Sequence, residues 1–292
     1  MLHTRPLGAG APAVSAIGYG GMHLSLADRP PEGQALRVLR AVLDAGITLL
    51  DTADVYCQDD RDIGHNERLI AQALKSWPGD RSRVLVATKA GMTRPGGRWE
   101  RDGRPAHIRL ACERSLRALG GDVIDLYQFH APDAAVPFAE SVGAFRDLRD
   151  EGKIRWVGIS NVSVAQIDEA RAIVPIASVQ NRLNPFFREA PTDGVVSHCE
   201  KLGIGFLAYS PVGGGRLNLK LPTHPVLAAL SERHGASPHA LALAWVRHQG
   251  KTVIPIPSAR TVEHALDSIH AVAITLTDEE MGAIARAEFS RE

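Results

Sequence analysis

Ile47-Thr48-Leu49-Leu50-Asp51 is the stretch that decides the fold, because a short apolar run ends there in an acidic residue. The pattern recurs in Val84-Leu85-Val86-Ala87-Thr88-Lys89 and in Ile124-Asp125-Leu126-Tyr127-Gln128-Phe129-His130. Segments that are apolar on successive residues are typical of strands covered on both faces. Because the C-terminal ends of the strands in a parallel barrel converge on one pocket, we expect the polar residues that end these runs to meet there.

Strand-like and helix-like segments alternate along the chain, which is typical of parallel βαβ units. We predict eight strands, near residues 16–19, 48–51, 84–89, 124–129, 155–160, 178–181, 205–209 and 252–256. Apolar residues at helical spacing predict helices over residues 33–45, 66–76, 109–119, 138–151, 164–173 and, less regularly, 191–202, and then over 225–234, 238–249 and 277–287. The predicted fold is therefore of the α/β class, a (β/α)8 barrel with extra C-terminal helices.

Few segments fall outside this alternation. Residues 5–7 and 13–15 flank Gly8-Ala9-Gly10-Ala11-Pro12, which predicts a β-hairpin covering the barrel floor. Since there is no linker, low-complexity run or repeat beyond the βα alternation, residues 1–292 are expected to form one domain. The glycine-rich stretches 90–105 and 210–216 follow strand ends, where barrel enzymes bind their ligands.

The composition argues against several classes of function. The 33 basic and 33 acidic residues leave no net charge, whereas a nucleic-acid-binding protein needs a basic face. Apolar runs are too short to span a bilayer, and residues 1–6 contain no apolar signal core. Three cysteines without metal-ligand spacing predict a cytoplasmic protein with free thiols and no metal site. One of them, Cys57, is either a reactive thiol beside Tyr56 or a small loop side chain.

A buried Lys–Asp pair beside a Tyr and a His is one way to donate a proton to a carbonyl group near neutral pH. Asp51, Lys89 and His130, joined by Tyr56 from the loop after the first run, form such a set. Each residue alone has a structural explanation, since Asp51 could cap a turn, Lys89 could lie at the surface and His130 could be a hydrogen-bonded turn residue. Their joint occurrence at strand ends favours the catalytic interpretation.

Three motifs resemble signatures of the aldo-keto reductases: Asp51-Thr52-Ala53-Asp54-Val55-Tyr56, Ala87-Thr88-Lys89 and Gln128-Phe129-His130-Ala131-Pro132-Asp133. The resemblance extends from about residue 17 to 268, and residues 18–22 and 289–292 look like those of short-tailed bacterial members. It implies a barrel that reversibly reduces aldehydes or ketones to alcohols, with hydride from C4 of the nicotinamide of NADPH. Carried over by position, Tyr56 is the proton donor, Lys89 lowers the pKa of Tyr56, Asp51 holds Lys89, and His130 orients the carbonyl group.

The resemblance also implies the contacts to NADP(H). Tyr209 would stack on the nicotinamide ring, while Ser160, Asn161 and Gln180 would hold its carboxamide. Arg216 would hold the pyrophosphate, and Arg260 with His264 would bind the 2′-phosphate. The predicted cofactor residues are Gly21, Met22, Asp51, Ser160, Asn161, Gln180, Tyr209, Ser210, Pro211, Val212, Gly214, Arg216, Ile256, Ser258, Ala259, Arg260, His264, Asp267 and Ser268.

The chain departs from the family pattern at the adenosine end. It has His264, Asp267 and Ser268 where members that prefer NADPH commonly have an arginine, a glutamate and an asparagine. Because a histidine side chain becomes charged only as the pH falls toward about 6, the preference for NADPH over NADH should be weaker than with arginine and should grow at lower pH. Asp267 and Ser268 are expected to hold the adenine with a shorter reach.

The substrate is expected to be a small carbonyl compound, bound by a monomer in a pocket lined by Met22, Tyr56, Trp99 and His130. Arg94, Arg98, Arg101 and Arg104 could attract an anionic substrate or could form a solvated loop. Two other functions stay open. One is a barrel aldolase in which Lys89 forms a Schiff base. The other is a binding protein that senses the redox state of its cofactor, like the channel-associated β subunits of this family.

Overall fold

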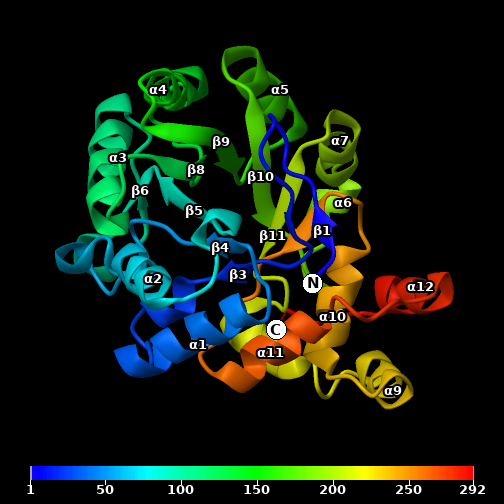
Figure 1. Cartoon of the computed structure of the whole chain (residues 1–292). Helices are drawn as coiled ribbons and strands as arrows, with labels where there is room; N and C mark the ends of the chain where they lie inside the picture. The colour runs from blue at the N-terminus through cyan, green and yellow to red at the C-terminus, as the bar shows by residue number, and fades with distance from the viewer. Residues whose placement is uncertain (1, 292) are drawn as a thin grey trace.

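Eight parallel strands form the wall of a barrel in the computed structural model, which describes residues 2–291 (Figure 1). Neighbouring strands hydrogen bond in the order β12-β11-β10-β9-β8-β5-β4-β3. Their bounds are β3 Tyr19–Gly20, β4 Leu49–Asp51, β5 Leu85–Ala90, β8 Ile124–Phe129, β9 Ile154–Ser160, β10 Ile176–Arg182, β11 Gly205–Tyr209 and β12 Val253–Pro255. The predicted (β/α)8 barrel is confirmed. Met1 and Glu292, the ends of the single domain that we predicted, lie outside the described residues, and the extent of that domain stays a prediction.

Main-chain hydrogen bonds beside the first and last strands close the barrel. The N–H of Gly18 donates to the carbonyl of Pro255 over 2.9 Å, and the N–H of Gly20 donates to that of Pro257 over 2.8 Å. A Cβ atom at Gly20 would lie 2.9 Å from the carbonyl oxygen of Ile256, so this approach requires glycine. The first strand begins later than predicted because the N–H of Ala16 donates to the carbonyl of His3 and not to the barrel.

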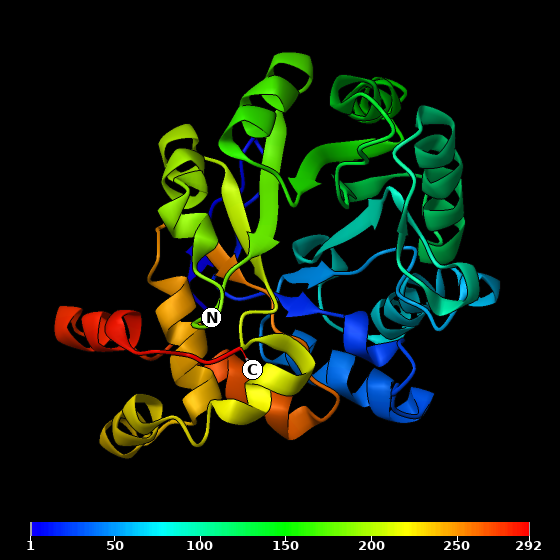
Figure 2. The ribbon, with the colours of Figure 1, turned by 180° about the vertical axis from the view of Figure 1, so that it is seen from behind.

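The helices cover the outside of the barrel (Figures 1 and 2). In α1, Ala35, Val38, Leu39 and Val42 are buried at helical spacing, as the sequence pattern predicts. The predicted helix over residues 191–202 is wrong in detail, because Gly194 breaks it with a left-handed φ of 79°. The helices are α1 Glu32–Asp44, α2 His65–Ser76, α3 Pro105–Leu119, α4 Phe138–Asp150, α5 Val164–Ile173, α6 Glu189–Thr192, α7 Val195–Leu202, α8 Gly214–Leu217, α9 Pro225–His234, α10 Pro238–Arg247, α11 Val262–His270 and α12 Asp278–Arg286.

The predicted N-terminal hairpin is present. Its strands, β1 Thr4–Arg5 and β2 Val14–Ser15, pair in antiparallel register. Leu7 and Val14 pack into the apolar cluster inside the barrel, against residues such as Leu49 and Leu85 at the N-terminal ends of their strands. The hairpin therefore covers the end of the barrel opposite the polar strand ends. None of the helices within residues 2–291 is both long and apolar enough to cross a membrane.

Candidate active site

The C-terminal ends of neighbouring strands bring the four predicted catalytic residues together. Asp51 ends β4, Lys89 lies near the end of β5, and His130 follows β8 directly. The Nζ atom of Lys89 lies 2.5 Å from Oδ1 of Asp51, 2.8 Å from the carbonyl oxygen of Thr52 and 3.1 Å from the hydroxyl of Tyr56. An ammonium group has three N–H donors, so these three partners satisfy it completely. Lys89 is fully buried, which argues against a surface role.

The second carboxylate oxygen of Asp51 is held by two buried glutamines. Nε2 of Gln128 donates to Oδ2 over 3.1 Å, and Nε2 of Gln180 donates to it over 2.8 Å. No role was predicted for Gln128, although this residue of β8 lies two positions before His130, so the alternation of side chains in extended backbone places both on the same side. Gln180 was predicted to hold the cofactor, but in this structure its amide donates to Asp51.

The protonation states follow from burial and from the close charges. Burial alone lowers the pKa of Lys89, but Asp51 and Tyr56 together outweigh it, so the pKa of the ammonium lies above its usual value. Burial is also the largest influence on Tyr56 and raises the pKa of the phenol, while Lys89 opposes this and Asp51 adds to it. We predicted a lowered pKa for Tyr56. Lys89 does act in that direction, but the loss of water around the phenol outweighs it.

His130 is held as a neutral imidazole beside the tyrosine. Burial and the charge of Lys89 lower the pKa of His130 far below its usual range. Its Nδ1 atom is buried without a hydrogen-bond partner among the described residues. The rings of Tyr56, His130 and Trp99 meet edge to face, with centroids 5.9 to 6.4 Å apart. Met22 packs against the small cluster that contains Tyr56, so all four residues predicted to line the substrate pocket lie together.

The residues predicted to hold the carboxamide form a bonded network of their own. The hydroxyl of Ser160 donates to the carbonyl of Gln180, and Nδ2 of Asn161 donates to Ser160 and to the carbonyl of His130. The hydroxyl of Tyr209 donates to Oδ1 of Asn161 over 2.8 Å. Asn161 and Ser210 adopt left-handed backbone conformations, with φ of 59° and 47°. Strained backbone of this kind is concentrated at ligand-binding sites.

The segment after β11, which includes the short helix α8, is tied to the C-terminal tail. Nη2 of Arg216, which we predicted to hold the pyrophosphate, donates to the carbonyl oxygen of Arg291 over 2.5 Å. The side chain of Arg291 bonds in turn to the carbonyl of Phe186 and to Glu189. This contact with residues near the end of the chain could not be foreseen from a motif in the segment. Gly214 in the same segment has a left-handed φ of 72°.

At the adenosine end, Arg260 and His264 are both exposed. Arg260 lies just before Thr261, which caps α11, and its guanidinium donates to the carbonyl of Asp28 over 3.0 Å. The other two residues predicted here already have partners. Asp267 accepts a hydrogen bond from Ser237, and the hydroxyl of Ser268 donates to the carbonyl of His264.

The remaining predicted cofactor residues follow the C-terminal ends of β3, β11 and β12. The carbonyl of Gly21 accepts from Nδ2 of Asn66, and a Cβ atom at Gly21 would lie 2.4 Å from the side-chain oxygen of Asn66. The hydroxyl of Ser258 accepts from the N–H of His23 over 3.4 Å, and the carbonyl of Ala259 accepts from Tyr19. Pro211 and Ile256 are buried, and Val212 is partly buried.

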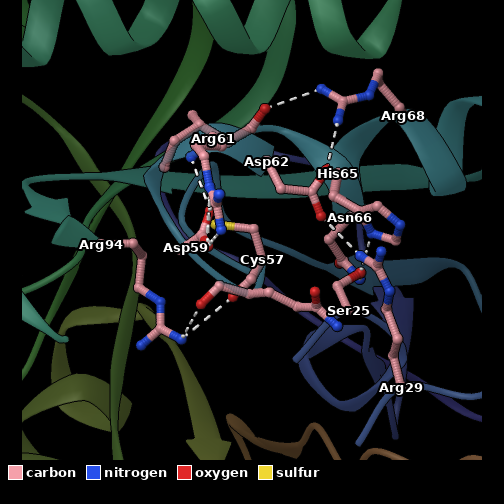
Figure 3. A network of polar contacts seen from close by, with 12 residues as sticks. Ser25, Arg29, Cys57, Asp59, Arg61, Asp62, His65, Asn66, Arg68 and Arg94 are labelled. Atoms are coloured by element: carbon pink, nitrogen blue, oxygen red, sulfur yellow. Dashed lines mark hydrogen bonds and ion pairs between the residues drawn. The ribbon is translucent and has the colours of Figure 1, made fainter. Parts of the chain in front are cut away.

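The long loop after β5 is not uniformly solvated. Arg98 and Arg104 are exposed and paired with Glu100 and Asp102, and Arg101 is exposed. Arg94 is buried, and its Nη2 atom donates to the carbonyls of Cys57 and Gln58, both over 3.2 Å (Figure 3). Of the two alternatives left open for these arginines, the solvated loop is therefore wrong for Arg94.

Cys57 lies in a buried position next to Tyr56. Burial raises the pKa of its thiol to about 12, with the charge of Arg94 acting in the opposite direction. Since the thiolate is the reactive form of cysteine, this position favours the interpretation of Cys57 as a small structural side chain.

Two buried carboxyl groups behind the site were not singled out in the sequence. Burial and the charge of Glu67 raise the pKa of Asp54 well above its usual value, and burial raises that of Glu67. Glu67 accepts from the hydroxyl of Thr88, the residue before Lys89, over 2.6 Å. Asn66 accepts from Thr52 and donates to Ser25. The start of α2 therefore supports the strand ends that carry Asp51 and Lys89.

Comparison with known proteins agrees with this geometry. Residues 16–288 match the model of the aldo/keto reductase family. A probable aldo-keto reductase 1 from Glycine max is 35% identical over an alignment that covers 94% of this chain and 85% of that protein.

Solved structures have the same architecture. The glycerol dehydrogenase from Gluconobacter oxydans superposes with a TM-score of 0.83 at 30% identity, over 96% of this chain and 93% of that one. An aldo-keto reductase from Klebsiella pneumoniae in complex with NADPH gives a TM-score of 0.81 at 28% identity, over 98% of this chain and 95% of that one.

Proposed function

The chain belongs to the aldo/keto reductase family, and on this premise we propose that it reduces small aldehydes and ketones to alcohols with NADPH, with Tyr56 as the proton donor. The proposal rests on the hydrogen bond from Nζ of Lys89 to the hydroxyl of Tyr56 over 3.1 Å, at the point where Asp51 and His130 also converge. NADPH as the cofactor is supported by the similar protein from Klebsiella pneumoniae, which binds it.

The residues at the mouth of the barrel fit this cofactor. The partly exposed ring of Tyr209 offers a stacking face, and the strained backbone at Asn161 and Ser210 marks the rim beside it. Arg260 and the N-terminus of α11 offer positive charge for a phosphate group. When bound, NADPH supplies the hydride. The chain's own residues have to orient the carbonyl group and deliver the proton.

Tyr56 suits the role of general acid in the direction of reduction. Because its pKa is raised, the phenol keeps its proton at neutral and moderately alkaline pH. When the proton moves to the carbonyl oxygen, the phenolate that forms lies beside the ammonium of Lys89, which stabilises it. A neutral His130 has one ring N–H, which can donate to the same oxygen and orient it.

The geometry disfavours the Schiff-base alternative. A lysine that attacks a carbonyl group must be a neutral amine with an open approach. Lys89 is fully buried, its three donors are occupied, and its raised pKa keeps it charged. The cofactor-sensing alternative differs from the reductase only in turnover, because both bind the cofactor.

A screen of aldehydes and ketones, followed by NADPH absorbance at pH 7, tests the proposal. We expect turnover on at least the more reactive aldehydes. Borohydride treatment with the same carbonyl compounds should add no covalent mass, whereas an aldolase would gain it. Tight NADPH binding without turnover on any carbonyl compound would exclude the reductase and favour the cofactor sensor.

A further inference from the structure

Arg94 is a buried cation close to Tyr56, and it has no role in the proposed mechanism. The residue is 6% exposed, and within residues 2–291 no carboxylate lies within ion-pair distance of its guanidinium. A buried charge without an ionic partner is costly, so such a group is retained where something else compensates it. Nη2 is satisfied by the carbonyls of Cys57 and Gln58, but Nε and Nη1 are buried without hydrogen-bond partners.

The guanidinium faces the substrate pocket through one aromatic ring. Its Cζ atom lies 4.0 Å from the centre of the Trp99 ring, which meets Tyr56 at 6.3 Å and His130 at 6.4 Å. The guanidinium therefore lies no more than about 10 Å from the ring of Tyr56, because the Trp99 ring is close to both groups. Trp99 is 43% exposed, so its ring can turn aside without disturbing the core.

Resting on the proposed carbonyl reduction, we infer that Arg94 binds a carboxylate at the far end of the substrate, so that the preferred substrates are short oxo acids. In this arrangement Trp99 covers the guanidinium and moves aside when the substrate enters. One N–H on Nε and two on Nη1 are then available to the carboxylate oxygens.

The charge of the loop matches a carboxylate better than a phosphate. Arg98 and Arg104 are each paired with an acidic neighbour, at 3.1 and 2.6 Å, and Arg101 is exposed to solvent, so that Arg94 is the buried cation among the four arginines of the loop. Asp59 and Asp60 follow shortly after Cys57, and Asp60 accepts from the N–H of Gly96 in the same loop. One buried positive charge among these groups compensates a monoanion, whereas a phosphate with nearly two charges would remain uncompensated.

The competing role of Arg94 is structural. Its bonds to the carbonyls of Cys57 and Gln58 hold the turn directly after Tyr56. A clamp of this kind would matter equally for every substrate, because it positions the proton donor. Substrate charge separates the two roles.

The test compares 4-oxobutanoate with its uncharged methyl ester, in wild type and in Arg94→Gln, with NADPH at pH 7. Glutamine removes the charge and keeps a polar amide, which lies where Nε of Arg94 does and is too short to reach the carbonyls bound by Nη2. Wild type should prefer the carboxylate by about tenfold or more in kcat/KM, as expected for a charged hydrogen bond. Arg94→Gln should remove this preference, mainly through a higher KM, while the ester keeps its rate within about twofold. Arg98→Gln is the matched control, because it removes a charge from the same loop and should leave the preference unchanged.

Several results would overturn the inference. Equal losses on both substrates in Arg94→Gln would leave Arg94 as a clamp only. Equal wild-type rates on acid and ester would reject carboxylate recognition without any variant, even if Arg94→Gln fails to fold. Turnover of the ester with no preference for the acid contradicts this inference alone, whereas no turnover of any aldehyde contradicts the proposed function.

Discussion

The ammonium of Lys89 and the carboxylate of Asp51 form a buried ion pair with a separation of 2.5 Å. Both side chains are shielded from water, because the side chain of Lys89 is 0% exposed and that of Asp51 is 3% exposed. Every polar atom of this pair is hydrogen bonded. Thr52 and Tyr56 accept from the two remaining N–H groups of the ammonium, and the amides of Gln128 and Gln180 donate to the second carboxylate oxygen. A pair of this kind keeps one orientation and places a fixed positive charge beside the phenol of Tyr56.

Replacing Lys89 by Met should abolish turnover and lower stability together. The change leaves Asp51 as an unpaired buried charge, which costs about 3 kcal/mol or more of the free energy of unfolding. Urea unfolding and aldehyde reduction measure the two effects. The double variant Lys89→Met with Asp51→Asn should regain part of the stability but no activity. Lys75→Met removes an exposed lysine and serves as the control. A Lys89→Met protein with wild-type stability and rate would contradict the buried-pair argument.

Tyr56→Phe should lower the rate of aldehyde reduction by roughly 10²–10⁴-fold, the usual contribution of a general acid. NADPH affinity, measured by fluorescence titration, should change little, because the ring remains. Since the pKa of Tyr56 is raised, wild-type reduction should also hold its rate between pH 7 and pH 9. A variant that keeps half of the wild-type rate on a reactive aldehyde would remove Tyr56 from this role.

Arg260→Ala should weaken the preference for NADPH over NADH. Arg260 is exposed, and within residues 2–291 its guanidinium donates to the backbone carbonyl of Asp28 and pairs with no carboxylate, so its charge is free to pair with a 2′-phosphate. Dissociation constants for both cofactors should show a loss of about tenfold for NADPH and little change for NADH. Arg37→Ala, an exposed arginine on α1, is the control. An unchanged ratio in Arg260→Ala would show that the phosphate is not recognised here.

Glu280 should stabilise the protein above acidic pH only. Hydrogen bonds from the N–H of Thr277, His234 and Arg233 lower the pKa of Glu280 from 4.5 to about 2, against the opposing effect of burial. The folded pKa is depressed, so the contribution is complete above about pH 4.5 and is lost as the pH falls toward 2. Allowing for screening by solvent, Glu280→Gln should cost about 1–2 kcal/mol at pH 7 and almost nothing at pH 2.

Unfolding in urea across this pH range measures the effect of Glu280→Gln. The control Glu279→Gln removes a charge from the same helical turn, but Glu279 is exposed. If both variants lose the same stability at every pH, the capping interaction of Glu280 has no special role.

The three cysteines should resist alkylation while the protein is folded. Cys57, Cys112 and Cys199 are all buried, and burial raises the pKa of each thiol to about 12. Iodoacetamide at pH 8 should therefore label none of them in the native state, and all three in denaturant, as counted by mass spectrometry. Rapid native labelling of Cys57 would restore the hypothesis of a reactive thiol beside Tyr56.

Local patterns account for most of the fold and for the residue types of the candidate site. Helical spacing located α5 at its observed bounds, and apolar runs located β8 and β11. Strand ends are short-range features, so Asp51, Lys89 and His130 could be predicted together. The alternation of side chains along β8 also indicates that Gln128 faces the candidate site, although no role was predicted for it.

The sequence by itself determined the α/β alternation and the polar residues that end three of the apolar runs, because both depend on neighbours a few positions away. Only the tertiary structure decided what those residues touch. Gln128 meets Asp51 across 77 positions, and Arg216 meets the main chain of Arg291 across 75. The tertiary structure also decided the pKa of Tyr56, which depends on how completely the fold removes water from the phenol. It likewise decided that Arg94 is buried while the other arginines of its loop stay exposed. Burial and long-range partners are set by packing, which no local pattern records.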